Sequence, residues 1–553
     1  MKKGSIFFFL LLMSIGVSLQ GQETLLKGVV KDAKYHTPVP YAALFIQGTS
    51  IGTVANNVGE FSFIVPDSLT DRQLMVARER FQLNSFPLNN RDRDDLIITL
   101  HPDGYVDKVL EMQDSIAVNS GSFGAFLSKA VKFVTNDWIP LGNTETNRFD
   151  FGRIQTIPTY NPIEGIRLRG GIASNSRLNP HFFVRGYVAY GFGDQRLKYR
   201  GEAIYSFTEK AYHEDEFPKN NLRLVHENDL YSPGDMHPYA LNDLLLVTYR
   251  RSLDEATYRN FAELNYEREY KNGLAHTFRV RQSRFVPQGE LRFESDYEDG
   301  VVYTDGQLHT TEIGVTMRYS VREAYDQQKR KRIPLELTSP LFFLSHTIGV
   351  NGFMGGEAGY HRTEFSAQKR FLLGNAGRLD AVGEVMKVWD RVPFPLLVYP
   401  NQRYRYQIEN NFFFLNRSLE FVADEQYTLR MTFVGDDFLL SKMAITDMLQ
   451  IKELISLRAA YGRLSDKNDP LLHPKELYRF PAVSHQYDSL PYIEGTIGIT
   501  NILGLLRVEY VHRFTYRNYP DAILSAVRVD ITLCFMYVPI PTTCPDLSGS
   551  RDE

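Results

Sequence analysis

Cysteine is nearly absent from this chain: Cys534 and Cys544 are the only two among 553 residues, and both lie near the C-terminus. Two cysteines are too few for a disulfide framework or for a cysteine-based zinc site. The sequence does not decide whether these two form a disulfide, because a disulfide needs an oxidising compartment and two thiols held close together.

Long apolar runs and an excess of one charge are missing as well. No run of about 18 apolar residues follows the N-terminus, which excludes a helical membrane protein. The 62 Lys and Arg nearly balance the 66 Asp and Glu, for a net charge of −4, so binding to nucleic acid or another polyanion is not expected as a global property. The mean hydropathy of −0.29 does not exclude a membrane β-barrel, because strands that alternate apolar and polar residues average to mild polarity.

Aromatic residues, by contrast, are plentiful, with 37 Phe and 32 Tyr but only 2 Trp. Such rings fit pleated sheets and membrane interfaces, so an all-β fold is favoured. At the N-terminus, Lys2 and Lys3 precede an apolar stretch at 6–19 and small or polar residues at 20–22. A charged start, a short apolar centre and a cleavable end predict a secretory signal peptide at 1–22, with an uncleaved anchor as the alternative.

Residues 24–101 read as several short strands separated by turn residues, a spacing typical of a small all-β sandwich. Phe61 and Phe63 share one face of a central strand, and Asn56, Asn57 and Gly59 supply turn chemistry before it. The expected strands lie at 26–30, 41–47, 59–65, 74–77 and 96–100.

The same segment carries motifs in a fixed order: Gly28-Val29-Val30, Asp32, Pro38-Val39-Pro40-Tyr41-Ala42, Ile46, Gly48-Thr49-Ser50-Ile51-Gly52-Thr53 and Gly59-Glu60-Phe61-Ser62. Together they resemble the carboxypeptidase-regulatory-like domain, a transthyretin-like β-sandwich that is often fused ahead of outer-membrane barrels. One departure is Arg80-Phe81, where the family usually has Gly-Tyr, and it concerns a local turn.

The regulatory-like domain is not the zinc peptidase, which needs a His-x-x-Glu pair and a later His. That spacing occurs four times in this chain, so it is unspecific. On a strand, residues three apart point to opposite faces, so the two pairs in strand-like sequence are poorly placed to ligate one ion. The four pairs are His213/Glu216, His309/Glu312, His361/Glu364 and His473/Glu476.

Residues 102–145 carry no strand alternation and are expected to form a connector. Apolar residues within 123–134 recur at helical spacing, which predicts a short amphipathic helix there. Such a helix either seals a pore or, more simply, packs its apolar stripe on a neighbouring surface.

From 146 to 538 the chain alternates repeatedly between an apolar and a charged face. The clearest segments are 197–205, 258–270, 506–516 and 527–535; in the second, Tyr258, Ala262, Leu264, Tyr266 and Tyr270 oppose Arg259, Glu263, Asn265, Glu267 and Glu269.

Three features favour a membrane barrel over a soluble sheet. The segments run about ten residues or more, the apolar faces end in aromatic residues, and the polar faces carry both charges, as suits a wet lumen. Because no sheet edge can stay open in lipid, the sheet must close. We therefore expect a small β-sandwich followed by a transmembrane antiparallel barrel of about 16 strands; an even count places both termini on one side, with the sandwich in the periplasm.

Further motifs follow in order: Glu164-Gly165-Ile166-Arg167-Leu168, 186–192, Asp194, Lys198-Tyr199, Glu312, Met317-Arg318-Tyr319, 393–397, Phe412, Leu415-Asn416, Glu420-Phe421-Val422, Asp424, Leu457-Arg458, Tyr492, Glu494, Gly498-Ile499 and Asn501-Ile502. They resemble an outer-membrane family of unknown function that joins a carboxypeptidase-regulatory-like domain to a barrel distantly similar to the Omp85 type. Two departures are a shorter middle region and a tail at 539–553 beyond the terminal aromatic residue.

Two loops are candidate binding sites. The oxygen-rich loop 212–237 could hold a divalent cation such as Ca²⁺, although it lacks regular ligand spacing and is more simply a solvated loop. The basic tetrad 329–332 could touch anionic lipid head groups, or be a solvated loop. No nucleophile–base pair or phosphate loop stands out, so no catalytic, cofactor-binding or metal residue is assigned and no cofactor is expected.

The charged face of the barrel offers either a channel lining or pairs of opposite charge that fill the interior, and the second is favoured. These residues are Lys198, Arg200, Glu202, Arg259, Glu263, Glu267, Arg279, Arg281, Arg507, Glu509, Arg513 and Arg528.

Three functions follow from the sequence. The first is a non-enzymatic outer-membrane barrel in membrane biogenesis or transport, with outer-membrane lipid around it and the sandwich as a docking module for periplasmic or outer-membrane assembly proteins. The second is a passive or gated pore. The third, a zinc carboxypeptidase-type hydrolase, rests only on a domain name and is disfavoured.

Overall fold

The computed structural model describes residues 23–33, 38–39, 42–47, 52–56, 59–66, 69, 72–78, 84–88, 96–101, 138–143, 146–152, 157–231, 233, 245–247, 255–270, 272–296, 302–320, 325–327, 332–334, 339–400, 413–435, 439–440, 451–502, 506–519 and 522–531. The predicted signal peptide, the predicted helix at 123–134, both cysteines, the tail 539–553 and most of the basic tetrad lie outside these residues. Within them, helical turns are short, and no helix is long and apolar enough to cross a bilayer.

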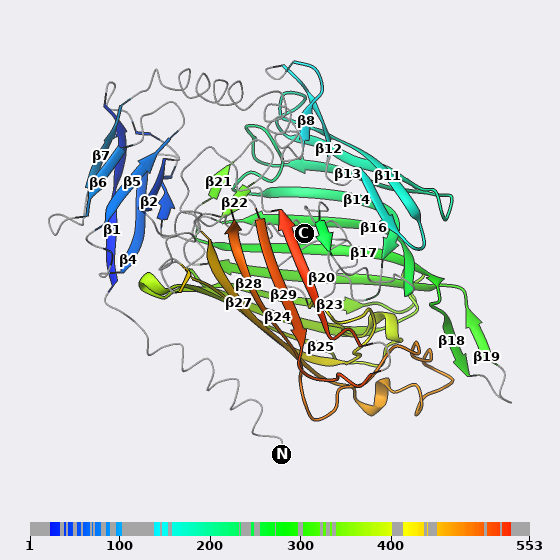
Figure 1. Cartoon of the computed structure of the whole chain (residues 1–553). Coiled ribbons are helices and arrows are strands. Elements are labelled where there is room, and N and C mark those ends of the chain that lie inside the picture. The colour runs from blue at the N-terminus through cyan, green and yellow to red at the C-terminus, as the bar shows by residue number, and fades with distance from the viewer. Residues whose placement is uncertain are drawn as a thin grey trace.

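Two small sheets form the front of the chain, drawn in blue in Figure 1. They share one hydrophobic core, in which Phe61, Phe63, Leu44 and Val76 are buried. Every strand expected from the sequence has a counterpart, and two short strands, β3 and β6, add to them. That this unit is a transthyretin-like sandwich stays a prediction. The first sheet holds β4 (Glu60–Pro66), β1 (Glu23–Asp32) and β7 (Leu96–Leu100); the second holds β3 (Gly52–Val54), β2 (Ala43–Ile46), β5 (Gln73–Ala77) and β6 (Asn84–Pro87).

A single large sheet of 19 strand segments takes up most of the remaining described residues. Its neighbouring strands pair in antiparallel fashion, and most follow one another along the chain, as in a meander. Its segments are β8 (Trp138–Pro140), β9 (Phe149–Gly152), β10 (Pro158–Asn161), β11 (Gly165–Ser174), β12 (Phe182–Gly191), β13 (Arg196–Ser206), β14 (Asn220–Tyr231), β15 (Leu245–Val247), β16 (Glu255–Glu269), β17 (Leu274–Gly289), β20 (Leu308–Ser320), β23 (Leu341–Gly349), β24 (Tyr360–Leu372), β25 (Gly377–Val388), β26 (Glu425–Gly435), β27 (Lys452–Arg463), β28 (Tyr492–Ile502), β29 (Leu506–Arg513) and β30 (Ser525–Ile531).

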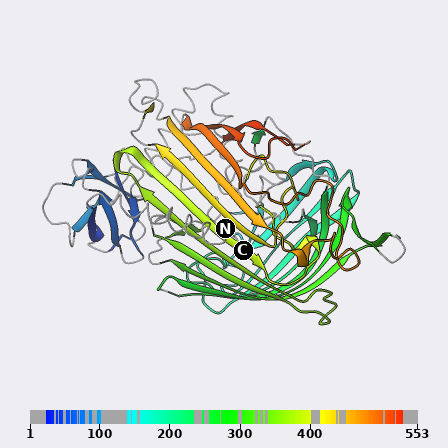
Figure 2. The same ribbon diagram turned by 90° about the horizontal axis from the view of Figure 1, so that it is seen from below.

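The large sheet curls into a barrel-like shape. Its strand order runs from β10 to β30 and on to β8 and β9, and β9 pairs again with β11 near the start of the sheet. Figure 2 shows the tilted strands curving around a common interior. The small hairpin β18–β19 (Phe293–Asp296, Val302–Asp305) projects from one end, and β21–β22 (Tyr325–Gln327, Arg332–Pro334) lie toward the front unit (Figure 1).

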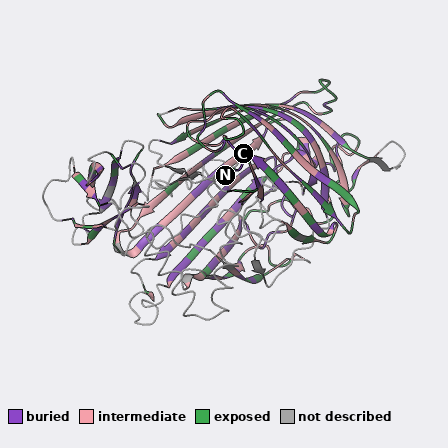
Figure 3. Ribbon diagram, turned by 90° about the horizontal axis from the view of Figure 1, so that it is seen from above, coloured by how far each residue is buried: buried purple, intermediate pink, exposed green. Residues whose placement is uncertain are grey.

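Burial in this sheet is reversed relative to a soluble protein. Figure 3 shows buried and exposed residues alternating along the strands. The buried face carries charge, with Arg458, Arg528 and Glu494 at 0–1 % exposure, whereas the exposed face is apolar. One cross-strand row runs Leu224, Leu264, Val280, Ile313 and Ile348 on five adjacent strands, and each side chain is between 38 and 55 % exposed.

Two details depart from the sequence analysis. The short strand β8 lies within 102–145, where no strand was expected, because Ile139 pairs with Phe151 at the entry to the large sheet. Tyr258, assigned to the apolar outer face, is buried with Leu230 and Ala256, and its hydroxyl donates to Asp194. Alternation therefore predicted correctly which residues of the strand share a face, but it did not predict that Tyr258, near the start of the strand, is covered by other side chains.

The expected geometry of two His-x-x-Glu pairs is found. His309 and Glu312 share β20, and His361 and Glu364 share β24, so each pair points to opposite faces of one strand.

Candidate functional site

The interior of the barrel is lined by ion pairs, which is the arrangement the sequence analysis favoured. Of the charged residues named for the lumen, most have a partner of opposite sign on a neighbouring strand or loop. These pairs include Lys198 with Glu164 and Asp194, Arg200 with Glu227, Arg281 with Glu263, Arg528 with Glu509, and Arg513 with Glu420. Two further pairs, Arg200 with Glu202 and Arg507 with Glu509, join residues of one strand.

One fully buried cluster joins the start of β11 to the end of β14. The Arg167 guanidinium donates from Nη1 and Nη2 to the two oxygens of Asp229, each at 2.7 Å. Tyr187 donates to the same carboxylate at 2.6 Å, and Arg167 Nη1 lies 3.2 Å from Glu164. Because both partners are 0–1 % exposed, this bidentate pair needs every one of these bonds to offset its desolvation.

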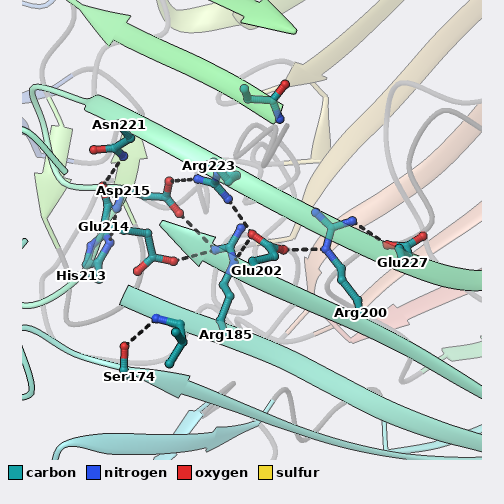
Figure 4. Close-up of polar contacts among 12 residues, drawn as sticks. Ser174, Arg185, Arg200, Glu202, His213, Glu214, Asp215, Asn221, Arg223 and Glu227 are labelled. Carbon is teal, nitrogen blue, oxygen red and sulfur yellow. Dashed lines mark hydrogen bonds and ion pairs between the residues drawn. The ribbon is translucent and has the colours of Figure 1, made fainter. Parts of the chain in front are cut away.

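A second cluster lies toward the other end of the same strands and is drawn in Figure 4. Glu202 on β13 accepts from Arg185 at 2.8 Å and from Arg223 at 2.9 Å. The loop between β13 and β14 turns inward and adds Glu214 and Asp215, which lie 2.9 and 3.3 Å from Arg185 Nη1. The loop is thereby fixed against the lumen wall by the charges it carries.

The oxygen-rich segment 212–237 was expected to be one loop, but it contains strand β14 (Asn220–Tyr231), because its alternating apolar residues pair with the neighbouring strands. The carboxylates of the described loop residues before β14 make internal bonds. Glu216 accepts the backbone N–H groups of Ala211, Tyr212 and His213 at 2.6, 2.7 and 3.1 Å. Among the described residues no group of three or more His, Cys, Asp or Glu is arranged to hold a metal ion. Residues 232 and 234–237 of this segment lie outside the described part of the chain.

Lys210 lies in the same inward loop and is 4 % exposed. Its ammonium donates to the carbonyls of Glu216 and Pro218 at 2.6 and 2.8 Å, and burial lowers the pKa of Lys210 to about 8. Since the unfolded chain keeps a pKa of about 10.4, the unfolded state binds more protons between these values. The contribution of Lys210 to stability therefore rises with pH across that window.

We expect competitive acetylation to show this directly. The reactivity of Lys210 in the folded protein should rise with a midpoint near pH 8, and the same residue in denatured protein should show its ordinary midpoint. A folded-state midpoint as high as the denatured one would contradict the buried position of this amine.

A long connection between β25 and β26 enters the barrel. The described parts of this connection, 389–400 and 413–424, contain many of the most buried apolar side chains of the chain. Phe394, Leu397 and Val398 pack with Phe293 and Leu308 in one cluster, and further along the connection Phe413, Leu415 and Phe421 pack against residues of β27 to β30.

Charged residues of the lumen wall hold this connection in place. The Glu494 carboxylate on β28 accepts the backbone N–H groups of Phe414 and Leu415 at 2.7 and 2.9 Å. Arg513 on β29 donates to Glu420 at 2.7 Å, and the Arg528 guanidinium lies 4.5 Å from the centre of the Phe414 ring. The lumen near β27–β30 is thus occupied by the chain itself.

The sequence identified the inward-facing Arg513 and Arg528 but did not predict that 389–400 and 413–424 pack inside the barrel, nor the role of Glu494. A usable signal was present: 393–399 and 412–415 are apolar runs without alternation, which suits neither a lipid-facing strand nor a solvated loop.

Comparison with known proteins finds no matching family model and no matching curated protein. Solved structures with a similar arrangement include BamA from Haemophilus ducreyi lacking POTRA domains 1-3 (8 % identity, 80 % of this chain, 88 % of that chain, TM-score 0.43). CdiB from Escherichia coli (11 %, 67 % and 60 %, TM-score 0.36) and the outer membrane protein OprD from Pseudomonas aeruginosa (9 %, 69 % and 90 %, TM-score 0.28) are others.

Proposed function

We propose that this chain is a non-enzymatic outer-membrane β-barrel that serves outer-membrane biogenesis or transport, with the front unit as a periplasmic docking module. The observation that carries the proposal is the reversed distribution of side chains. Charged residues fill the inside of the curled sheet, and apolar residues cover its outside. Only a hydrocarbon surrounding stabilises such an exterior on a closed sheet.

The pairing pattern supports a barrel of sixteen strands. β9 and β10 pair with different parts of the same strand, at Ile172–Ser174 and Gly165–Leu168 of β11. Taken as one interrupted strand, and with the short segments β8 and β15 set aside, they bring the count to 16. An even number places the front unit and the C-terminal strand on the same side of the membrane.

One substitution separates a membrane barrel from a soluble one. Leu264 is 45 % exposed between Leu224 and Val280. In lipid, Leu264→Arg near the bilayer centre should lower the free energy of unfolding by about 2–4 kcal/mol. The folded barrel should then convert to its unfolded electrophoretic band at a lower temperature. Leu264→Phe is the matched control and should leave that temperature almost unchanged. If Leu264→Arg were neutral and the protein fractionated with soluble proteins, the outer-membrane proposal would be wrong.

The docking role can be tested in intact cells. Ile97 on β7 is 65 % exposed on the front unit, so a photoreactive residue at position 97 should crosslink to a periplasmic or outer-membrane protein. The same probe at Leu457, on the apolar outside of β27, should crosslink to lipid. Absence of any protein adduct at position 97, together with purification free of protein partners, would contradict docking.

The second candidate is a gated pore, and the occupied lumen favours a closed resting state. We expect the unmodified protein to show almost no conductance in planar bilayers. The hydrolase alternative has no support in the described residues, and a chelator-sensitive peptidase activity of the purified protein would be needed to restore it.

A further inference from the structure

Two histidines meet on the outer face of the barrel, away from the lumen network. His346 lies on β23 and His361 on β24, and both are exposed. His346 Nε2 lies 3.3 Å from His361 Nδ1. The strands fix this approach, because His346 pairs with Thr363 and Ile348 pairs with His361 in the antiparallel register. From this geometry we propose that His346 and His361 form a binding site for a divalent transition-metal ion.

The separation of the two nitrogens matches what such an ion requires. Imidazole nitrogens bind Zn²⁺ at about 2.0–2.1 Å in tetrahedral geometry, which places two of them roughly 3.3 Å apart. Imidazole ligands suit Zn²⁺, Ni²⁺ and Cu²⁺, with Cu²⁺ bound most tightly of the three. Because the rings already lie at this distance on adjacent strands, little reorganisation is needed to bind the ion.

The surroundings orient the first ring for binding. His346 Nδ1 lies 3.0 Å from Thr363 Oγ1, and the same hydroxyl oxygen accepts from Trp389 Nε1 at 2.9 Å. When His346 Nδ1–H donates to this oxygen, its Nε2 lone pair is directed at the second ring, which is how a metal-bound histidine is usually supported.

The second ring needs only a change of tautomer. Without metal, His361 Nδ1–H donates to His346 Nε2; when the ion binds, that proton moves to His361 Nε2 through solvent and Nδ1 becomes a ligand. Both rings stay neutral, and no net proton is released. The backbone of His361 is also held, since its N–H donates to Asp390 at 2.7 Å and its carbonyl accepts from Trp389 N–H at 2.8 Å.

The site has two protein ligands and open positions for water. No third His, Cys, Asp or Glu joins the pair within the part of the chain that the structure describes. His361 is the second residue of β24, and Trp389 follows the last residue of β25. The pair thus lies at a rim of the sheet, where water can complete the coordination shell.

Trp389 provides the readout for the test. The chain has two tryptophans, and Trp138→Phe leaves Trp389 as the only one in the full-length purified protein. We expect added Cu²⁺ to quench its fluorescence with saturation. Zn²⁺, which does not quench, should compete for the site and restore the signal.

Variants assign the ligands. His346→Asn and His361→Asn should each weaken Cu²⁺ binding by about tenfold or more, because the remaining imidazole loses a second ligand held at high effective concentration. His226→Asn is the matched control, since His226 is an exposed histidine on β14 whose ring centre lies 5.5 Å from Tyr199; it should bind Cu²⁺ as the parent does.

Other results would overturn the site. These are no saturable quenching, equal quenching in the parent and both ligand variants, or an equal loss in His226→Asn. A retained heat-dependent band shift shows that each variant is folded. The proposal rests only on the β23–β24 pairing, so its failure would leave the membrane assignment untouched.

Discussion

Replacing Glu494 with Ala is expected to open the lumen. Glu494 is fully buried, and its two oxygens accept the backbone N–H groups of Phe414 and Leu415. It also lies 3.7 Å from the buried guanidinium of Arg458. Removing one partner of a buried charged pair costs about 3–5 kcal/mol. Here the lost interaction is the one that holds 413–424 against the lumen wall.

The measurement is single-channel conductance in planar bilayers, together with limited proteolysis of the connection. The parent should be almost silent, whereas Glu494→Ala should show frequent open events and faster cleavage between 389 and 424. Glu425→Ala is the matched control, because Glu425 is a carboxylate at the start of β26 that is 28 % exposed and pairs with Lys387 at 2.8 Å. An unchanged, silent Glu494→Ala variant that remains folded would argue against the connection as the seal.

Replacing Arg167 with Ala is expected to give the largest loss of stability. The change leaves Asp229 and Glu164, both 0 % exposed, without the guanidinium that joins them. The expected cost is again about 3–5 kcal/mol. Arg167→Lys should recover only part of it, because an ammonium cannot make the two parallel bonds that reach both oxygens of Asp229.

The measurement is the free energy of unfolding in denaturant, with the loss of the heat-dependent gel shift used to monitor the unfolded fraction. Arg268→Ala is the control: Arg268 is exposed near the end of β16, so its loss should change stability by less than about 0.5 kcal/mol. If Arg167→Ala and Arg268→Ala unfolded at the same denaturant concentration, the buried cluster would not be the stabilising feature described above.

Both predictions concern residues whose burial followed from the sequence only in part. Alternation placed Glu509 and Arg513 opposite Val508 and Tyr510, and the structure has the first two buried and Tyr510 exposed. The reason is local: successive residues of any strand point to opposite faces, whatever the strand pairs with. The same reasoning erred at Tyr258, because a covering segment distant in sequence changed its surroundings.

The alternation of residues along a strand did not predict which charged residues pair with one another. Arg167 bonds to a carboxylate 62 residues away, and Glu494 accepts from Phe414 80 residues before it. Such contacts depend on the register of each strand pair and on the curvature that brings distant strands to one lumen. A one-residue change in register would exchange the two faces of a strand, and the local pattern does not specify which strand a given residue meets.

The sequence by itself therefore determined that the chain is built of strands with one charged and one apolar face, because that property belongs to each strand alone. Only the tertiary structure decided which charges pair, and that the described residues of 389–400 and 413–424 pack into the barrel instead of away from it. These outcomes depend on closure: once the sheet curls, its charged face has no water-filled space except the lumen, and the nearest long connection carries the apolar side chains that fill it.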